Sequence, residues 1–123
     1  MMEITYNKPV YWMGGANRCE AGRITGFLEE IDEIVVEPDY AKSTAIRMEL
    51  VHCFETKEQA IKSEIEKYEQ KIEKTKKENK KFVLSREMLH GEHFNEKELN
   101  DGTTEKYQKA IVFLKSQLDE VKK

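Results

Sequence analysis

Apolar and polar residues alternate in the first part of the chain, which is typical of strands that bury one face. The clearest alternation begins at Ile46, where every second residue up to Phe54 is directed to the same face. This stretch is either one long strand or two strands separated near Val51. The candidate strands, the first of them a short edge strand, are residues 3–6, 10–13, 20–28, 34–36 and 46–54.

Two glycines interrupt the second clear strand and predict that it is bent. Gly22 and Gly26 lie on either side of Ile24 in residues 20–28, and Ile24 and Leu28 would share one face. Glycine inside a strand weakens it and marks a bend or a close backbone approach. Short strands with bent positions favour a small curled antiparallel sheet or an SH3-like barrel.

The period of the apolar residues changes from two to about 3.6 after Thr56. Thr56 and Gln59 form a capping box in which the threonine oxygen accepts from the Gln59 amide and the glutamine side chain reaches the Thr56 amide. Two apolar rows with helical spacing follow. They consist of Ile61, Ile65, Tyr68, Ile72, Thr75, Asn79 and Phe82, and of Tyr107, Ile111, Leu114, Leu118 and Val121.

Two apolar helical rows in one chain predict an antiparallel helical hairpin. The fold class is therefore α+β, with residues 1–55 as the sheet or barrel and residues 56–123 as the hairpin, within one folding unit. We expect residues 82–102 to be a structured connection, with a short helical piece after Ser85 that Gly91 stops and a second cap at Asn95. Its apolar side chains either pack over the end of the hairpin or form a contact surface.

Charge is distributed unevenly along the chain. Of the 123 residues, 21 are Lys or Arg and 24 are Asp or Glu, for a net charge of −3, and the first 55 residues carry a net −5. This distribution is unlike that of a general nucleic-acid binder. No apolar run has the length of a signal peptide or a membrane span, so we expect a cytoplasmic protein with no membrane contact. Cys19 and Cys53 are expected to be thiols.

Candidate catalytic and metal-binding residues are few. His90 and His93 are three residues apart, but Gly91 between them indicates a helix end, so no metal site is predicted. Arg18 and Arg23 could lower the pKa of the Cys19 thiol, yet no histidine except His52 lies on an obvious neighbouring strand. No phosphate-binding glycine motif is present. We therefore expect neither an enzyme nor a cofactor, and we interpret His52 as a hydrogen-bonded core or rim residue.

Two charged stretches stand out. Six acids and no Lys or Arg lie between residues 29 and 39, which is typical of a solvated edge or of a patch for a basic partner. In the predicted first helix Lys67, Lys71 and Lys74 form a stripe, followed by more lysines up to Lys81. Interleaved glutamates make a solvated helix face the simpler interpretation.

The joint between strands and helix resembles that of many small uncharacterised proteins of bacteriophages and mobile elements of Firmicutes-type hosts. The resemblance covers residues 8–75 and is carried by residues 54–60, Phe-Glu-Thr-Lys-Glu-Gln-Ala, followed by a helix rich in Lys and Glu. It implies a short cytoplasmic product that binds and blocks a host or defence protein, and it implies no catalytic residue.

The leading hypothesis is a non-catalytic protein-binding module with a protein partner. Its predicted contact residues are Glu29, Glu30, Asp32, Glu33, Met88, Leu89, His93 and Phe94.

The alternative is a nucleic-acid-associated protein that uses the SH3-like sheet and the lysine-rich helix. Its contact residues would be Tyr11, Trp12, Arg23, Lys74, Lys77 and Lys81. A metal-dependent enzyme or sensor is a third, weaker hypothesis, and self-association through the helices is compatible with all three.

Overall fold

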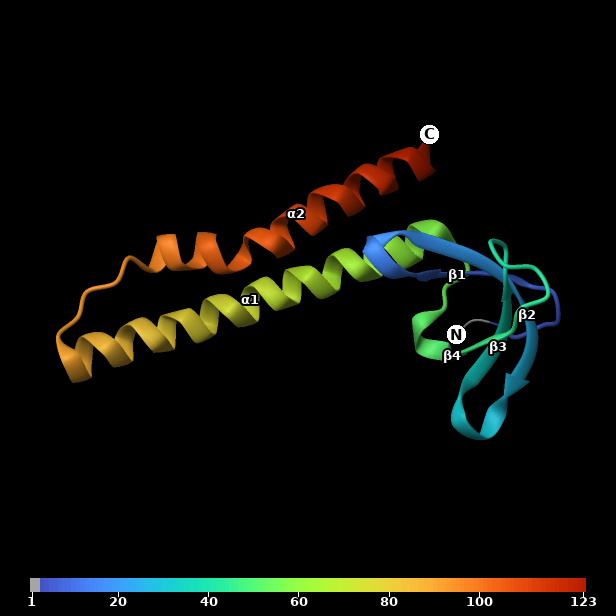
Figure 1. Cartoon of the computed structure of the whole chain (residues 1–123), viewed down its shortest axis with the longest axis horizontal. Coiled ribbons are helices and arrows are strands. Elements are labelled where there is room, and N and C mark those ends of the chain that lie inside the picture. The colour runs from blue at the N-terminus through green and yellow to red at the C-terminus, as the bar shows by residue number, and fades with distance from the viewer. Residues whose placement is uncertain (1–2) are drawn as a thin grey trace. The chain divides into compact units, whose positions relative to one another are not determined.

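The computed structural model describes residues 3–123 and shows the predicted α+β fold, a four-stranded antiparallel sheet followed by two helices (Figure 1). The chain forms two compact units, which we describe separately. Unit 1 contains the residues up to Glu64 together with Leu114–Lys123, and unit 2 contains Ile65–Phe113.

The sheet of unit 1 is an antiparallel meander in which consecutive strands are neighbours. This order needs only short connections, because each strand pairs with the next one along the chain. The strands are β1 (Pro9–Met13), β2 (Cys19–Leu28), β3 (Glu33–Pro38) and β4 (Ile46–Glu49).

The predicted fourth strand is divided, and its second part returns to the first strand. After β4 the chain forms a 3-10 turn, η3 (Leu50–His52). Phe54 then pairs with Tyr11 of β1, with backbone N···O distances of 2.9 and 2.8 Å. The meander is thereby curled so that the segment after β4 lies against its first strand.

The core of unit 1 lies on one face of this sheet. Val10 and Trp12 are buried from β1, and Ile34 and Val36 are buried from β3. The predicted edge strand at residues 3–6 is wrong, since these residues form no strand. Ile4 nevertheless packs against the core.

A β-bulge changes the predicted face of the second half of β2. The register shifts between Ile24 and Gly26, so Ile24 is buried while Leu28 is 37% exposed. Gly22 lies where the β3 backbone and the Trp12 ring come close to β2. A Cβ atom there would be 2.6 Å from the Glu37 carbonyl oxygen and 2.8 Å from the Trp12 ring, so only glycine fits.

Helix α1 (Lys57–His90) begins at the predicted capping box, with one difference in the bonds. The Gln59 amide donates to the Thr56 hydroxyl oxygen at 3.1 Å, as predicted. The Gln59 side chain accepts from the Glu55 amide at 3.2 Å, one residue before the expected partner. Both bonds satisfy amides near the start of the helix.

The prediction of a connection over residues 82–102 is wrong in extent. Helix α1 continues to His90, and α2 (Glu96–Lys122) begins soon after it, so Ser85 lies inside α1 and caps nothing. Gly91 does end α1, with φ of +65° and its amide 3.1 Å from the Glu87 carbonyl oxygen. Asn95 caps α2 as predicted, because its side-chain oxygen accepts from the Glu98 amide at 3.2 Å.

Unit 2 is a helical hairpin with a polar middle. The Asn79 side-chain amide donates to Asn100 and to the Thr103 hydroxyl, both at 2.9 Å. Thr104 is fully buried, and its hydroxyl donates to the Asn100 carbonyl oxygen at 2.7 Å. The side chains of Asn79, Asn100 and Thr103 can form these hydrogen bonds in only one alignment of the two helices, so they favour a single register.

Candidate functional site

The turn between β2 and β3 carries the predicted acidic contact residues. Glu29 and Glu30 belong to the 3-10 turn η2 (Glu29–Ile31) and are exposed, and Asp32 follows with φ of +50°. Glu33 begins β3, and its carboxylate lies 3.0 Å from the Arg47 guanidinium. The four acids therefore lie together in sequence and space, but Glu33 already has a basic partner.

The same turn exposes apolar side chains that the sequence interpretation missed. Phe27 is 38% exposed, Leu28 is 37% exposed and Ile31 is 53% exposed. The bulge in β2 explains the first two, because it ends the alternation that would have buried every second residue. Three exposed apolar side chains therefore lie among the acids of this turn.

The last turns of α1 carry the predicted apolar contact residues. Met88 is 83% exposed and Leu89 is 74% exposed, which makes them the most exposed large hydrophobic residues of the described chain. Leu84 is 49% exposed, whereas Val83 is buried. Because residues 82–90 are helical, side chains four residues apart share a face, and Leu84 therefore lies beside Met88.

The remaining side chains at this end of unit 2 pack against one another. The Phe94 ring meets the Phe82 ring edge-on, with centroids 5.4 Å apart. The Arg86 guanidinium binds Glu92 with N···O distances of 2.8 to 3.2 Å. Phe94 is thus half-buried and packs at the end of the hairpin, whereas Met88 and Leu89 stay exposed.

His93 lies at the same end of the hairpin and is almost fully exposed. Its Nδ1 is 3.5 Å from a Glu87 carboxylate oxygen. Within residues 3–123, no group of three or more His, Cys, Asp or Glu side chains is arranged to hold a metal ion. His52 is also on the surface, with Nε2 3.5 Å from Glu49, so it is a rim histidine.

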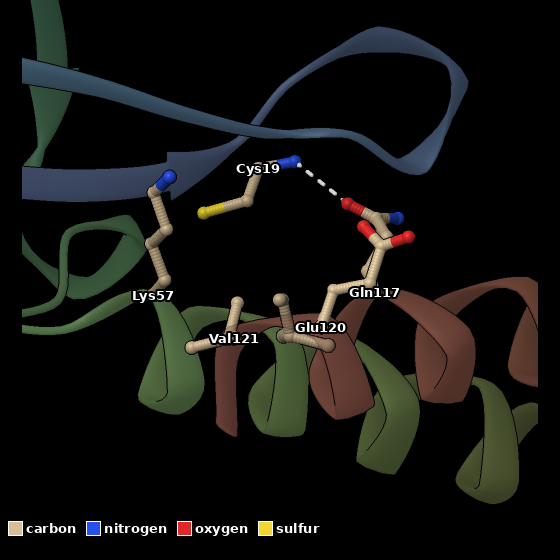
Figure 2. Close-up of a pocket in the computed structure, with 6 residues that line it drawn as sticks. Cys19, Lys57, Gln117, Glu120 and Val121 are labelled. Atoms are coloured by element: carbon tan, nitrogen blue, oxygen red, sulfur yellow. Dashed lines mark hydrogen bonds between the residues drawn. The ribbon is translucent and has the colours of Figure 1, made fainter. Parts of the chain in front are cut away.

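Unit 1 contains a hollow of about 360 Å³ beside Cys19 (Figure 2). The side-chain amide of Gln117 joins α2 to the β1–β2 loop here, because it accepts from the Cys19 amide at 3.4 Å and donates to the Asn17 carbonyl oxygen. In Figure 2 the Cys19 sulfur is directed into the hollow on the side of Lys57. The other lining residues are Ile61, Glu120 and Val121.

The environment of Cys19 favours the neutral thiol. Burial raises its pKa, the nearby Lys57 charge lowers it in part, and Glu20 raises it further. The predicted influence of Arg18 and Arg23 is not among these causes. Burial also raises the pKa of Cys53, to about 11. Since the thiolate is the nucleophilic form, neither cysteine is activated at neutral pH.

Of the residues of the nucleic-acid alternative in unit 1, Tyr11 and Arg23 share the sheet face opposite the core, whereas Trp12 lies on the core face. Trp12 is only 7% exposed and belongs to the core, so its ring is not available for stacking on a base. Tyr11 is half-buried, and the Arg23 guanidinium donates to the Asn7 carbonyl oxygen at 3.2 Å. Lys74, Lys77 and Lys81 are exposed on α1.

Comparisons of this chain with protein-family models, with curated proteins and with solved structures found no match. Among the described residues, neither helix has an apolar stretch long enough to cross a membrane.

Proposed function

We propose that this protein is a non-catalytic protein-binding module. The observation that carries the proposal is the exposure of Met88 and Leu89 on a regular helix, at 83% and 74%. Large apolar side chains that a helix holds in water are a feature of surfaces that bind other proteins. In keeping with the resemblance to phage and mobile-element proteins, the partner is a host or defence protein that binding blocks.

A partner that covers the end of α1 would remove these side chains from water. Burying a Leu or Met side chain contributes about 1.5–3 kcal/mol before the costs of association are subtracted. Met88 and Leu89 are already about one-fifth buried, so each contributes near the lower end of that range. Replacing both with serine should therefore weaken the complex at least tenfold.

The acidic turn gives the module a second contact, which favours a partner with basic side chains. Glu29 and Glu30 are exposed acids beside Phe27, Leu28 and Ile31. A partner segment that combines basic and apolar side chains would complement this surface. Glu33 takes little part in the attraction, because Arg47 already neutralises it.

The test is affinity capture from a bacterial lysate treated with nuclease, followed by titration calorimetry with the purified partner. The Met88→Ser/Leu89→Ser variant should lose the partner, and the matched control Val51→Ser/Val112→Ser should keep it, because both valines are about 70% exposed elsewhere. Equal loss in the two variants would contradict the proposal, as would capture that yields no protein once nucleic acid is digested.

Charge reversal tests the acidic turn separately. Glu29→Lys/Glu30→Lys should weaken binding more at low salt than at high salt, since exposed charges are screened. The control Glu66→Lys/Glu69→Lys reverses two exposed acids of α1 and should leave the affinity unchanged.

A further inference from the structure

A tyrosine pair lies beside a hollow on one side of the unit 2 hairpin. The rings of Tyr68 and Tyr107 are tilted by 40° with centroids 5.9 Å apart. Tyr107 is half-buried and lines a hollow of about 600 Å³ together with Thr75 of α1 and with Gly102, Thr103, Glu105, Lys106 and Lys109 of α2. Part of an aromatic ring is therefore open to a ligand at this position.

Two lysines contact these rings and form no ion pair among the described residues. The Lys71 ammonium lies 5.0 Å from the Tyr68 centroid and 5.8 Å from the Tyr107 centroid, and the Lys106 ammonium lies 5.1 Å from the Tyr107 centroid. Among the described residues, no carboxylate lies within ion-pair distance of either lysine, in contrast to Lys109, which Glu105 binds at 3.1 Å. Both ammonium groups can therefore bind an incoming anion without first breaking an ion pair.

The charges of α1 are separated in the same region. Lys67, Lys71 and Lys74 are spaced by four and three residues, so they share one side of the helix with the Tyr107 contact, and this row of lysines is bounded by Glu64 and Glu78 at its two ends. The acids Glu66, Glu69 and Glu73 are spaced by three and four residues on another side. Residues two apart on a helix differ by about 200° in direction, so Glu69 and Glu73 face away from Lys71. The tyrosines thus lie beside a positive surface.

We propose that this side of the hairpin binds single-stranded nucleic acid. A base stacks on the Tyr107 ring. The Lys71 and Lys106 ammonium groups leave the rings and bind phosphate oxygens. This combination of aromatic stacking and a positive groove is the usual means of binding a single strand without reading its sequence. Gly102 leaves the α2 backbone open to the nucleic acid, because it has no side chain and a Cβ atom there would meet nothing within 4 Å. The site is separate from the contacts at Met88 and Leu89 that define the proposed function.

Fluorescence anisotropy with a labelled oligothymidylate of about twelve nucleotides, a length that one small site can cover, tests the proposal on the full chain. With about three phosphates bound, the logarithm of the affinity should fall with the logarithm of the salt concentration with a slope of about −2. Lys71→Ala/Lys106→Ala should make this slope shallower by about 1.4. The matched control Lys76→Ala/Lys80→Ala removes the same charge from the other side of α1 and should change the affinity less than twofold.

The ring is tested apart from the charges. Tyr107→Leu keeps an apolar side chain and should weaken binding about tenfold at an unchanged salt slope, because stacking is lost. Tyr107→Phe should bind like the unmodified chain, and circular dichroism checks that both variants keep their helices. An unaffected Tyr107→Leu variant, or a control lysine pair that weakens binding as much as the test pair, would overturn the proposal.

Competitors identify the ligand class. Unlabelled oligothymidylate should displace the labelled strand, whereas thymidine monophosphate and polyglutamate should need at least a hundredfold higher concentration. Equal competition by the mononucleotide would make the ligand a free nucleotide, and equal competition by polyglutamate would make it an acidic peptide. Either result, or no binding at low salt, refutes the single-strand proposal.

Discussion

Gly102 offers the sharpest stability test, because it lies in the interior of α2 without a structural need for glycine. An added Cβ atom would meet nothing within 4 Å, and the residue has no left-handed backbone conformation. Glycine in a helix interior is less favourable than alanine by about 0.8–1.0 kcal/mol. The new methyl group stays exposed and adds little burial, so Gly102→Ala should raise the free energy of unfolding by about 1 kcal/mol.

The expected change is large enough to measure by far-UV circular dichroism during urea and thermal unfolding. An unfolding entropy of about 2.1 cal/mol/K per residue over 123 residues converts 1 kcal/mol into a Tm increase of about 4 °C. Gly22→Ala is the matched control and should lower Tm, because its Cβ would lie 2.6 Å from the Glu37 carbonyl oxygen. If Gly102→Ala lowered Tm, the open surface described around this residue would be wrong.

Three further outcomes are expected from unit 1. Gln117→Leu should cost about 1–2 kcal/mol in urea unfolding, because the Asn17 carbonyl and the Cys19 amide lose their partner; the exposed Gln70→Leu should stay within about 0.5 kcal/mol, and equal effects would contradict this role. The raised pKa of Cys53 stabilises the folded state below pH 9.0, and this contribution is lost as the pH rises toward about 11. The fall in unfolding free energy over that range should therefore be smaller in Cys53→Ala, and an identical fall would refute the assignment. In the folded chain a thiol reagent should modify half-buried Cys19 before buried Cys53, as mass spectrometry of the labelled protein would show.

Local signals predicted most of the elements correctly. The alternation over residues 10–13 gave the strand β1, and the capping residues Thr56 and Asn95 gave the starts of both helices. These features depend on neighbours within four residues, so the sequence contains all the information they need.

The prediction of a connection over residues 82–102 was wrong because the local pattern there does not show a helix. Its scattered apolar residues lack a clear period, yet the helix continues through them, with Val83 buried and Phe82 packed against Phe94.

Some features of the candidate sites likewise depend on residues adjacent in sequence, and others depend on residues far apart in the chain. The acids of residues 29–33 and the exposed Met88 and Leu89 were identified from the chain alone, because they are adjacent in sequence. The exposure of Phe27 and Leu28 depends on a bulge, and the pairing of Tyr68 with Tyr107 joins residues that are far apart in the chain.

The sequence by itself determined that strands precede two helices, where both helices begin, and where the charges lie. Only the tertiary structure decided that Trp12 is a core residue, that Gln117 binds the β1–β2 loop, and that Lys71 and Lys106 both contact the Tyr107 ring. The physical reason is that capping and periodicity act within a few residues. Burial and ring contacts instead depend on which distant segments the packed backbone brings together.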